Sequence, residues 1–218
     1  MNRPHIIVNV SMTADGKIDS AARKGATISS QTDKARVDGL RASVDAVLVG
    51  GRTLLNEDPK LTLNSAELRA GRIQKGLPEN PAKVGIFSEI PIGMSEGLHS
   101  MHGVHGAATS SPLGHFLTSG PAKVYLFTTQ CIDPELIAQF ETAGAKVQTM
   151  GEERVDLISG FRSLSKAGIR SVLVEGGGTL IAELFRLNLV DELTIYIAPK
   201  IFGGTTAPRL ADGRGFLA

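Results

Sequence analysis

The chain has 218 residues, a formal net charge of +1 and one cysteine, Cys131. This length fits one ordinary domain with its own hydrophobic core, and a lone cysteine excludes an internal disulfide and a thiol-built metal site. The small net charge gives no long-range attraction to nucleic acid or membranes, and no apolar run approaches the ~20 residues of a membrane span. The first residues lack the layout of a signal peptide, so we expect a cytoplasmic protein.

Short apolar runs alternate with stretches of helical periodicity along the chain. β-Branched runs predict strands, and apolar residues spaced three and four apart predict amphipathic helices. Asp133-Pro134 and Asp156 are typical of helix starts. The alternation predicts an α/β fold in a single domain over 1–218, with a mostly parallel central sheet flanked by helices. In chain order, the predicted elements are a strand at 6–10, a helix at 32–42, a strand at 46–49, a short helix at 52–56, strands at 83–87 and 123–128, a helix at 133–144, a strand at 146–149, a helix at 156–168, a strand at 171–174, a helix at 179–187 and a strand at 192–198.

Two stretches carry no regular pattern. Residues 64–82 are predicted to be a polar connection that is partly helical, and 91–120, rich in Gly, Ser and His, to be a long mobile insertion loop. His99, His102 and His105 are spaced by three within that loop. Glycines among them disfavour the helix that would bring three imidazoles to one zinc ion, so we expect no metal site.

Two sites have the order strand, glycines, helix. Gly50-Gly51 follows the strand at 46–49, and Gly176–Gly178 follow the strand at 171–174. A helix N-terminus offers unpaired N–H groups and a partial positive charge to a phosphate, and glycines let the phosphate approach the backbone. Glycines also serve simply to form tight turns, but two such sites in one small domain favour a phosphate-bearing ligand. Neither site matches the dinucleotide fingerprint or the P-loop.

Charged residues follow three of the predicted strands. They are Asp15-Gly16-Lys17, Asn56–Pro59 and Glu175. Ligands of open α/β sheets bind outside the carboxyl ends of the strands, so Lys17 is a candidate for contact with a phosphate or a sugar hydroxyl. The acids are candidates for contact with hydroxyl or amino groups. Each residue taken singly is also compatible with an ordinary turn or a solvated surface.

Together, these motifs resemble the riboflavin-biosynthesis reductases, both the stand-alone enzymes and the reductase half of the bifunctional deaminase–reductase. The resemblance implies a dihydrofolate-reductase-like fold, a homodimer and NADPH-dependent reduction of the ribose of a ribosylaminopyrimidine 5′-phosphate to the ribitylamino product. The ring-opened glycosylamine is an imine whose carbon accepts hydride, so such an enzyme mainly holds two phosphorylated ligands close together. The matching stretches, in order, are SMTADGK (11–17), ISS (28–30), LRA (40–42), DAVLVG (45–50), TLLNEDPKLT (53–62), VEGG with TL (174–180), LVDEL (189–193) and FGG with AP (202–208).

The resemblance also implies roles by position. Lys17 and Glu175 are implied to be catalytic, with Lys17 orienting or polarising the sugar near C1′. The implied cofactor contacts are Thr53, Glu57, Ser88, Gly176, Gly177, Gly178 and Thr179. The implied substrate contacts are Ser29, Arg41, Leu61 and Glu175.

The chain departs from the family pattern at several positions. Glu57 stands where the family usually has aspartate, Phe87 precedes Ser88 where aspartate is frequent, and Asn64 stands where bifunctional members carry a phosphate-binding arginine. Family members continue past Asp212–Phe216 with two more strands, which we expect to be missing here. Two other interpretations stay open: a dihydrofolate-type NADPH reductase and a catalytically inactive nucleotide-binding dimer. The diamino and the deaminated pyrimidine both fit the sequence, as do NADPH and NADH, with Arg52 the candidate 2′-phosphate contact.

Overall fold

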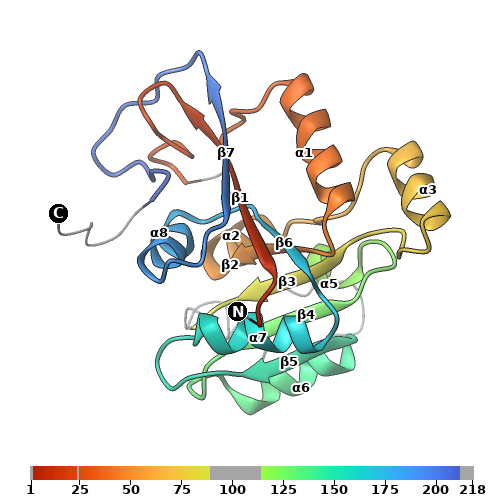
Figure 1. Cartoon of the computed structure of the whole chain (residues 1–218). Coiled ribbons are helices and arrows are strands. Elements are labelled where there is room, and N and C mark those ends of the chain that lie inside the picture. The colour runs from red at the N-terminus through yellow and green to blue at the C-terminus, as the bar shows by residue number, and fades with distance from the viewer. Residues whose placement is uncertain (1, 24, 89–113, 212–218) are drawn as a thin grey trace, which may run out of the picture.

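The central feature of the fold is a parallel β-sheet. The computed structural model describes residues 2–23, 25–88 and 114–211, and within them the strand order is β5-β4-β3-β2-β6-β1-β7. Every pair of neighbouring strands runs parallel, which confirms the predicted α/β class. The strands are β1 (His5–Thr13), β2 (Ala46–Gly50), β3 (Ala82–Ile86), β4 (Val124–Thr128), β5 (Ala145–Thr149), β6 (Ser171–Val174) and β7 (Glu192–Ala198) (Figure 1).

Helices cover both faces of the sheet, and each face has its own apolar core. Because successive side chains of a strand point to opposite faces, Val8 of β1 packs with α7 and α8, whereas Val49 of β2 packs with α2, α5 and α6. The neighbouring strands β2 and β6 therefore send their following helices to opposite faces. The helices are α1 (Gln31–Ser43), α2 (Gly51–Glu57), α3 (Ala66–Gln74), α5 (Gly114–Thr118), α6 (Pro134–Thr142), α7 (Leu157–Lys166) and α8 (Gly178–Arg186).

Helix starts follow the capping chemistry of the sequence. The Asp133 and Asp156 side chains accept hydrogen bonds from the backbone N–H groups of Glu135 and Ser159 at the first turns of α6 and α7. The strand predicted at 6–10 is longer than expected, because the chain pairs with β7 as far as Thr13. Sequence periodicity alone does not reveal that pairing partner.

The predicted loop at 91–120 is wrong at its end, since 114–118 form the short helix α5. The Asp58 carboxylate accepts hydrogen bonds from the backbone N–H groups of His115 and Phe116, and these bonds begin the helix. A cap from a residue so far away in sequence leaves no local signal. The rest of that loop with its three histidines, and the segment Asp212–Phe216, lie outside the described residues.

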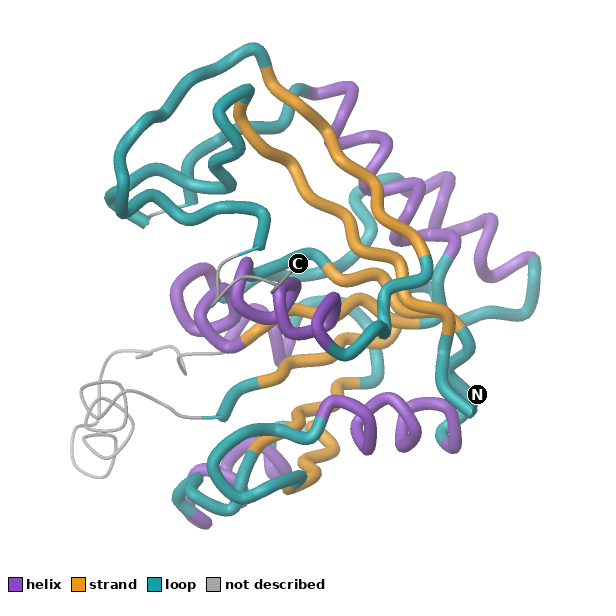
Figure 2. The backbone as a smooth tube through the Cα atoms, turned by 60° about the vertical axis from the view of Figure 1, so that its left-hand side comes forward, coloured by secondary structure: helices purple, strands orange, loops and turns teal. Residues whose placement is uncertain are grey.

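Two loops beyond the ends of β1 and β7 pack on each other. Both figures show these long strands side by side, reaching past the rest of the sheet and ending in neighbouring loops (Figures 1 and 2). The Asp15 carboxylate accepts from the N–H groups of Phe202 and Gly203, and Lys17 forms a β-bridge with Arg209. The segment after β1, which includes the Asp-Gly-Lys motif, is thereby held in place by the segment after β7.

An ion pair at the start of β1 makes stability depend on pH. Arg3 donates two hydrogen bonds to the Asp191 carboxylate, at 2.5 and 2.8 Å, and with them lowers the pKa of Asp191 to about 2. Folding stability is therefore full above the ordinary carboxyl pKa of 3.8 and falls as the pH drops toward 2. We expect Asp191→Asn to lower the free energy of unfolding by about 1–2 kcal/mol at pH 7 and far less at pH 2.5, measured by urea unfolding. Exposed Glu141→Gln is the control, and an equal loss at both pH values would contradict the ion pair.

Candidate functional site

A cavity of about 570 Å³ opens at the carboxyl ends of β1, β2 and β6. Its walls come from β1, the segments 18–23 and 25–29, α1, one side of α2 and the loop Glu175–Gly178. The helices that follow β2 and β6 leave to opposite faces of the sheet, and such a divergence is where ligands of open parallel sheets bind. The fold thus brings residues far apart in sequence to one concave site.

The two glycine turns meet beside this cavity. The backbone N–H of Gly50 donates to the Gly176 carbonyl at 2.9 Å, so the ends of β2 and β6 are directly bonded. Gly176 has φ +132°, a conformation that L side chains rarely adopt. A Cβ on Gly177 would lie 3.1 Å from the Thr53 hydroxyl oxygen, and the Gly176–Gly177 peptide bond is cis. Arg52 and Thr179, from the first turns of α2 and α8, are hydrogen-bonded to each other.

An ion pair forms a second wall of the cavity. The Arg41 guanidinium binds both Glu175 carboxylate oxygens at 2.7 Å and also donates to the Thr62 carbonyl at 3.1 Å. The side chains are 19% and 12% exposed, so the pair is largely shielded from water. Burial lowers the pKa of Arg41, but Glu175 more than compensates and the pKa is raised. The pair carries a fixed positive and a fixed negative group at the end of β6.

A third wall is acidic. Burial and then the nearby Asp19 carboxylate raise the pKa of Glu57 above its usual value. Asp19 itself accepts hydrogen bonds from the backbone N–H groups of Gly25 and Ala26, which hold the segment after β1 in its turn. The Glu57 side chain thus meets the cavity as a carboxyl group that takes up a proton more readily than an ordinary glutamate.

Most of the residues singled out from the sequence line this cavity. Those that the structure brings together there are Ser29, Arg41, Thr53, Glu57, Glu175, Gly176, Gly177 and Gly178. The glycine turn after β6 and Glu175 therefore share one site, as their places after a parallel strand indicated. Gly50 and Gly51 do not line the cavity, and a Cβ on Gly51 would instead lie 2.7 Å from the Phe87 side chain. The individual roles of these residues stay predictions.

The structure places four other predicted residues outside the cavity lining. Leu61 is 2% exposed within the core, and the Ser88 hydroxyl accepts from the N–H of Val155. Thr179 follows the lining residue Gly178. Lys17 is 9% exposed, and its ammonium has no hydrogen-bond or ion-pair partner among the described residues. Their predicted roles at a ligand are likewise untested.

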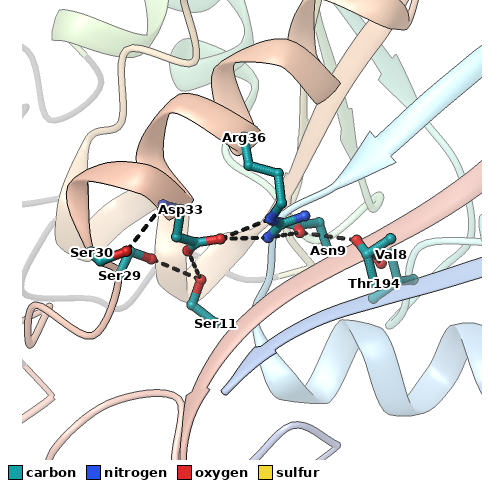
Figure 3. Close-up of polar contacts among 8 residues, drawn as sticks. All are labelled: Val8, Asn9, Ser11, Ser29, Ser30, Asp33, Arg36 and Thr194. Carbon is teal, nitrogen blue, oxygen red and sulfur yellow. Dashed lines mark hydrogen bonds and ion pairs between the residues drawn. The ribbon is translucent and has the colours of Figure 1, made fainter. Parts of the chain in front are cut away.

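Polar residues on β1 face the cavity, although no sequence motif singled them out. Asn9 is 5% exposed and Ser11 lies two residues on, on the same side of the strand. Both are joined to α1 through Asp33 and Arg36 (Figure 3). The available signal was two polar residues at alternate positions in a strand that is otherwise apolar. No motif singled out Asp38 either, and its carboxylate accepts from the N–H groups of Asn64 and Ser65 at the cavity edge.

The described residues contain no group of three His, Cys, Asp or Glu side chains arranged to hold a metal ion. The helices in the same part of the chain are all too short or too polar to cross a lipid bilayer.

Comparison with known proteins identifies the family. The family model of the RibD C-terminal domain matches residues 4–218. The chain belongs to the RibD C-terminal domain family. It is 37% identical over 215 residues to the 2,5-diamino-6-ribosylamino-4(3H)-pyrimidinone 5′-phosphate reductase of Archaeoglobus fulgidus, covering 99% of this chain and 89% of that protein. It is 33% identical to the protein of the same name from Methanothermobacter thermautotrophicus, covering 98% and 86%.

Solved structures agree on the fold. A pyrimidine reductase-like protein from Corynebacterium diphtheriae superimposes with a TM-score of 0.72 at 19% identity, covering 97% of this chain and 81% of that one. A deaminase/reductase from Thermotoga maritima gives 0.67 at 23% identity, and the match spans 96% of this chain and 48% of the bifunctional one. The fold of the RibD C-terminal family is thus confirmed, with the dihydrofolate-reductase-like architecture predicted for it.

Proposed function

We propose that this protein reduces the ribose of a ribosylaminopyrimidine 5′-phosphate to the ribitylamino product in riboflavin biosynthesis, with NADPH as the reductant. The observation that carries the proposal is the joint lining of one cavity by Gly176–Gly178 after β6, by Arg52 and Thr53 at the start of α2, and by the Arg41–Glu175 pair, in a chain 37% identical to a reductase of that name. A cavity of this size and polarity suits small phosphorylated ligands.

The residues around Gly177 fit a dinucleotide. A side chain on Gly177 would crowd Thr53, so the bare backbone at this position leaves space for a ligand to lie against it. The first N–H groups of α8 have no intrahelical acceptor and suit the cofactor phosphates. Thr53 and Glu57, from the facing helix α2, suit the adjoining cofactor groups. Arg52 suits the 2′-phosphate and favours NADPH over NADH. When bound, NADPH supplies the hydride.

The opposite wall suits the substrate. Arg41 and Glu175 keep their charges close to each other, so together they offer a donor and an acceptor to the ribose phosphate or pyrimidine without a net charge. Ser29 and Asn9 add polar contacts from the side of β1. The segments 18–23 and 25–29 contribute a wall of the cavity, and we expect a sugar carbon bound against them to be partly shielded from water.

The test combines binding with turnover. We expect NADPH to raise the melting temperature of the full chain, and absorbance at 340 nm to fall when the ribosylaminopyrimidine phosphate is added. Stabilisation without oxidation would indicate a binding protein, and oxidation with dihydrofolate alone would indicate a folate reductase. NADH measured in parallel decides the cofactor preference.

Lys17 does not line the cavity, but it follows β1, whose Asn9 and Ser11 do, and we propose that its side chain reaches the sugar carbon of the bound substrate. Its ammonium has no partner within the described residues, although its backbone is fixed by the hydrogen bonds of Thr13. We expect Lys17→Ala to lower kcat by about a hundredfold while the free energy of unfolding changes by less than about 1 kcal/mol. Equal losses of turnover and stability, measured by NADPH oxidation and urea unfolding, would make Lys17 a structural residue.

We also propose a cytoplasmic homodimer. The edge strand β7 exposes Leu193, Ile195 and Ile197, between 39% and 58%, on one side of the sheet, and apolar rows of this kind are commonly covered by a partner. Sedimentation of the chain at micromolar concentration is expected to give the mass of two copies. A monomer at that concentration would contradict the proposal.

A further inference from the structure

Beyond the groups that line the cavity, a hydrogen-bonded network ties β1 to α1 and β7. Arg36 donates two hydrogen bonds to Asp33, at 2.7 and 2.9 Å, and one to the Asn9 side-chain oxygen at 2.9 Å (Figure 3). The Thr194 hydroxyl of β7 donates to the same Asn9 oxygen at 3.0 Å. Neither Asp33 nor Arg36 lines the cavity, so the network reaches it only through other side chains.

The chemistry of arginine decides which way the Asn9 amide faces. A guanidinium only donates hydrogen bonds, so the Asn9 atom that meets Arg36 is the carbonyl oxygen. The amide nitrogen then faces away from Arg36. It has no partner among the described residues, yet Asn9 is 95% buried and lines the cavity. The Asn9 nitrogen is not among the buried side-chain atoms without a hydrogen-bond partner in the described chain, which are Arg3 Nε and Thr128 Oγ1, so it opens to the cavity and is available to donate to a ligand oxygen.

Asp33 holds the network rigid. Its side chain is fully buried and accepts from Arg36 on one oxygen and from the Ser11 hydroxyl on the other, at 2.8 Å. The Ser29 hydroxyl donates in turn to Ser11 at 2.8 Å. Burial acts to raise the pKa of Asp33, but its interactions with the neighbouring serine hydroxyls and with Arg36 outweigh it and lower the pKa. A charged Asp33 orients Arg36. It also accepts the hydrogen bond of the Ser11 hydroxyl, so Ser11 in turn accepts the hydrogen bond of the Ser29 hydroxyl.

We infer that Arg36, held by Asp33, is a positioning residue that fixes the Asn9 carboxamide with its NH2 group toward the cavity, where it donates to an oxygen of the pyrimidine substrate. The Ser29 hydroxyl donates its proton to Ser11, so at the cavity its oxygen acts only as a hydrogen-bond acceptor. The network therefore sets the donor and acceptor pattern that the substrate meets on the side of β1. This inference rests on the proposed function and names one specificity determinant of that same site.

The test compares three arginine substitutions. The glutamine of Arg36→Gln can accept as well as donate a hydrogen bond, so the Asn9 side-chain amide is free to rotate by about 180°. The lysine of Arg36→Lys can only donate, so it keeps the Asn9 oxygen facing position 36. We expect Arg36→Gln to raise KM for the pyrimidine substrate about tenfold and to leave the Kd of NADPH within about twofold, and Arg36→Lys to restore most of the loss. Arg186→Gln is the matched control, because it breaks an arginine–carboxylate pair of the same spacing at the exposed end of α8.

A second comparison separates positioning from mere stability. In the Asn9→Ala background, Arg36→Gln is expected to cause no further rise in KM, because the group that it positions is gone. The same tenfold rise in both backgrounds would overturn the inference, as would a fall in melting temperature with an unchanged KM. An inactive wild-type chain would instead count against the proposed function.

A measurement that does not depend on activity tests the inference even if the wild-type chain is inactive. In the isotope-labelled full chain, NMR signals of the Asn9 side-chain amide are identified by their loss in Asn9→Ala. We expect their hydrogens to exchange with solvent within about tenfold of the rate of an exposed asparagine, because they face the cavity. Protection of about a hundredfold or more would place them inside the network and overturn the inference.

Discussion

Arg41→Met is expected to lower kcat/KM for the pyrimidine substrate by at least about a hundredfold and the free energy of unfolding by about 3 kcal/mol. The substitution leaves the Glu175 carboxylate, only 12% exposed, without its guanidinium, and it removes the hydrogen bond to the Thr62 carbonyl. An uncompensated charge in a shielded site is costly, and the carboxylate loses the orientation that Arg41 gives it where the substrate binds. NADPH oxidation and urea unfolding measure the two effects.

The double variant separates stability from activity. Replacing Glu175 as well removes the stranded charge, so Arg41→Met/Glu175→Met is expected to regain about 2 kcal/mol of the stability lost by Arg41→Met alone. Its activity stays lost, because both groups that face the substrate are absent. A kcat/KM of Arg41→Met within about threefold of the wild type would contradict the prediction. The Arg41–Glu175 ion pair would then only hold the end of β6 against α1, and it would not belong to the substrate site.

Much of the fold follows from local chemistry in the sequence. The strand at 171–174 and the strand at 192–198 have their predicted bounds, because β-branched residues and polar boundaries mark them. The parallel sheet follows from the alternation of such strands with capped helices. Its strand order depends on pairings between distant segments, and no local pattern encodes them.

Only some residues of the candidate site can be predicted from the sequence. Glycines after a strand and an acid at a strand end are visible in the sequence, and Gly176–Gly178 and Glu175 do line the cavity. Asn9 was missed because an asparagine within a strand is usually an ordinary polar residue, and its donor faces the cavity only through Arg36, which comes 27 residues later. The position of Lys17 depends on the segment after β7, which pairs with it across the sheet edge.

Lys83 shows the same dependence on distant contacts. It begins a strand in the sequence, yet its side chain is fully buried under α5. The ammonium donates to the carbonyls of Phe116 at 2.8 Å and Ser119 at 2.5 Å, and the Phe116 ring lies 5.9 Å away. Burial lowers the pKa of Lys83 to about 8, against a smaller opposing effect of Asp58. The lysine therefore loses its charge more easily in the folded chain than in the unfolded one.

The free energy of unfolding is accordingly expected to rise with pH above 8. Between the folded pKa of about 8 and the ordinary value of 10.5, the unfolded chain binds a proton that the folded chain has released. Stability rises with pH wherever the unfolded state binds more protons, so Lys83 contributes an increase of about 3 kcal/mol across this window. Urea unfolding at pH 7.5, 9 and 10 measures the slope for the wild type and for Lys83→Met.

The comparison with Lys83→Met isolates the contribution of this one group. Other titrating residues are shared by both chains, so only the difference between their slopes belongs to Lys83. Lys123→Met, an exposed lysine just before β4, is expected to keep the wild-type slope. Parallel slopes for the wild type and Lys83→Met would mean that the carbonyls of Phe116 and Ser119 stabilise the ammonium enough to offset its burial. Lys83 would then remain charged in the folded chain to the same pH as in water.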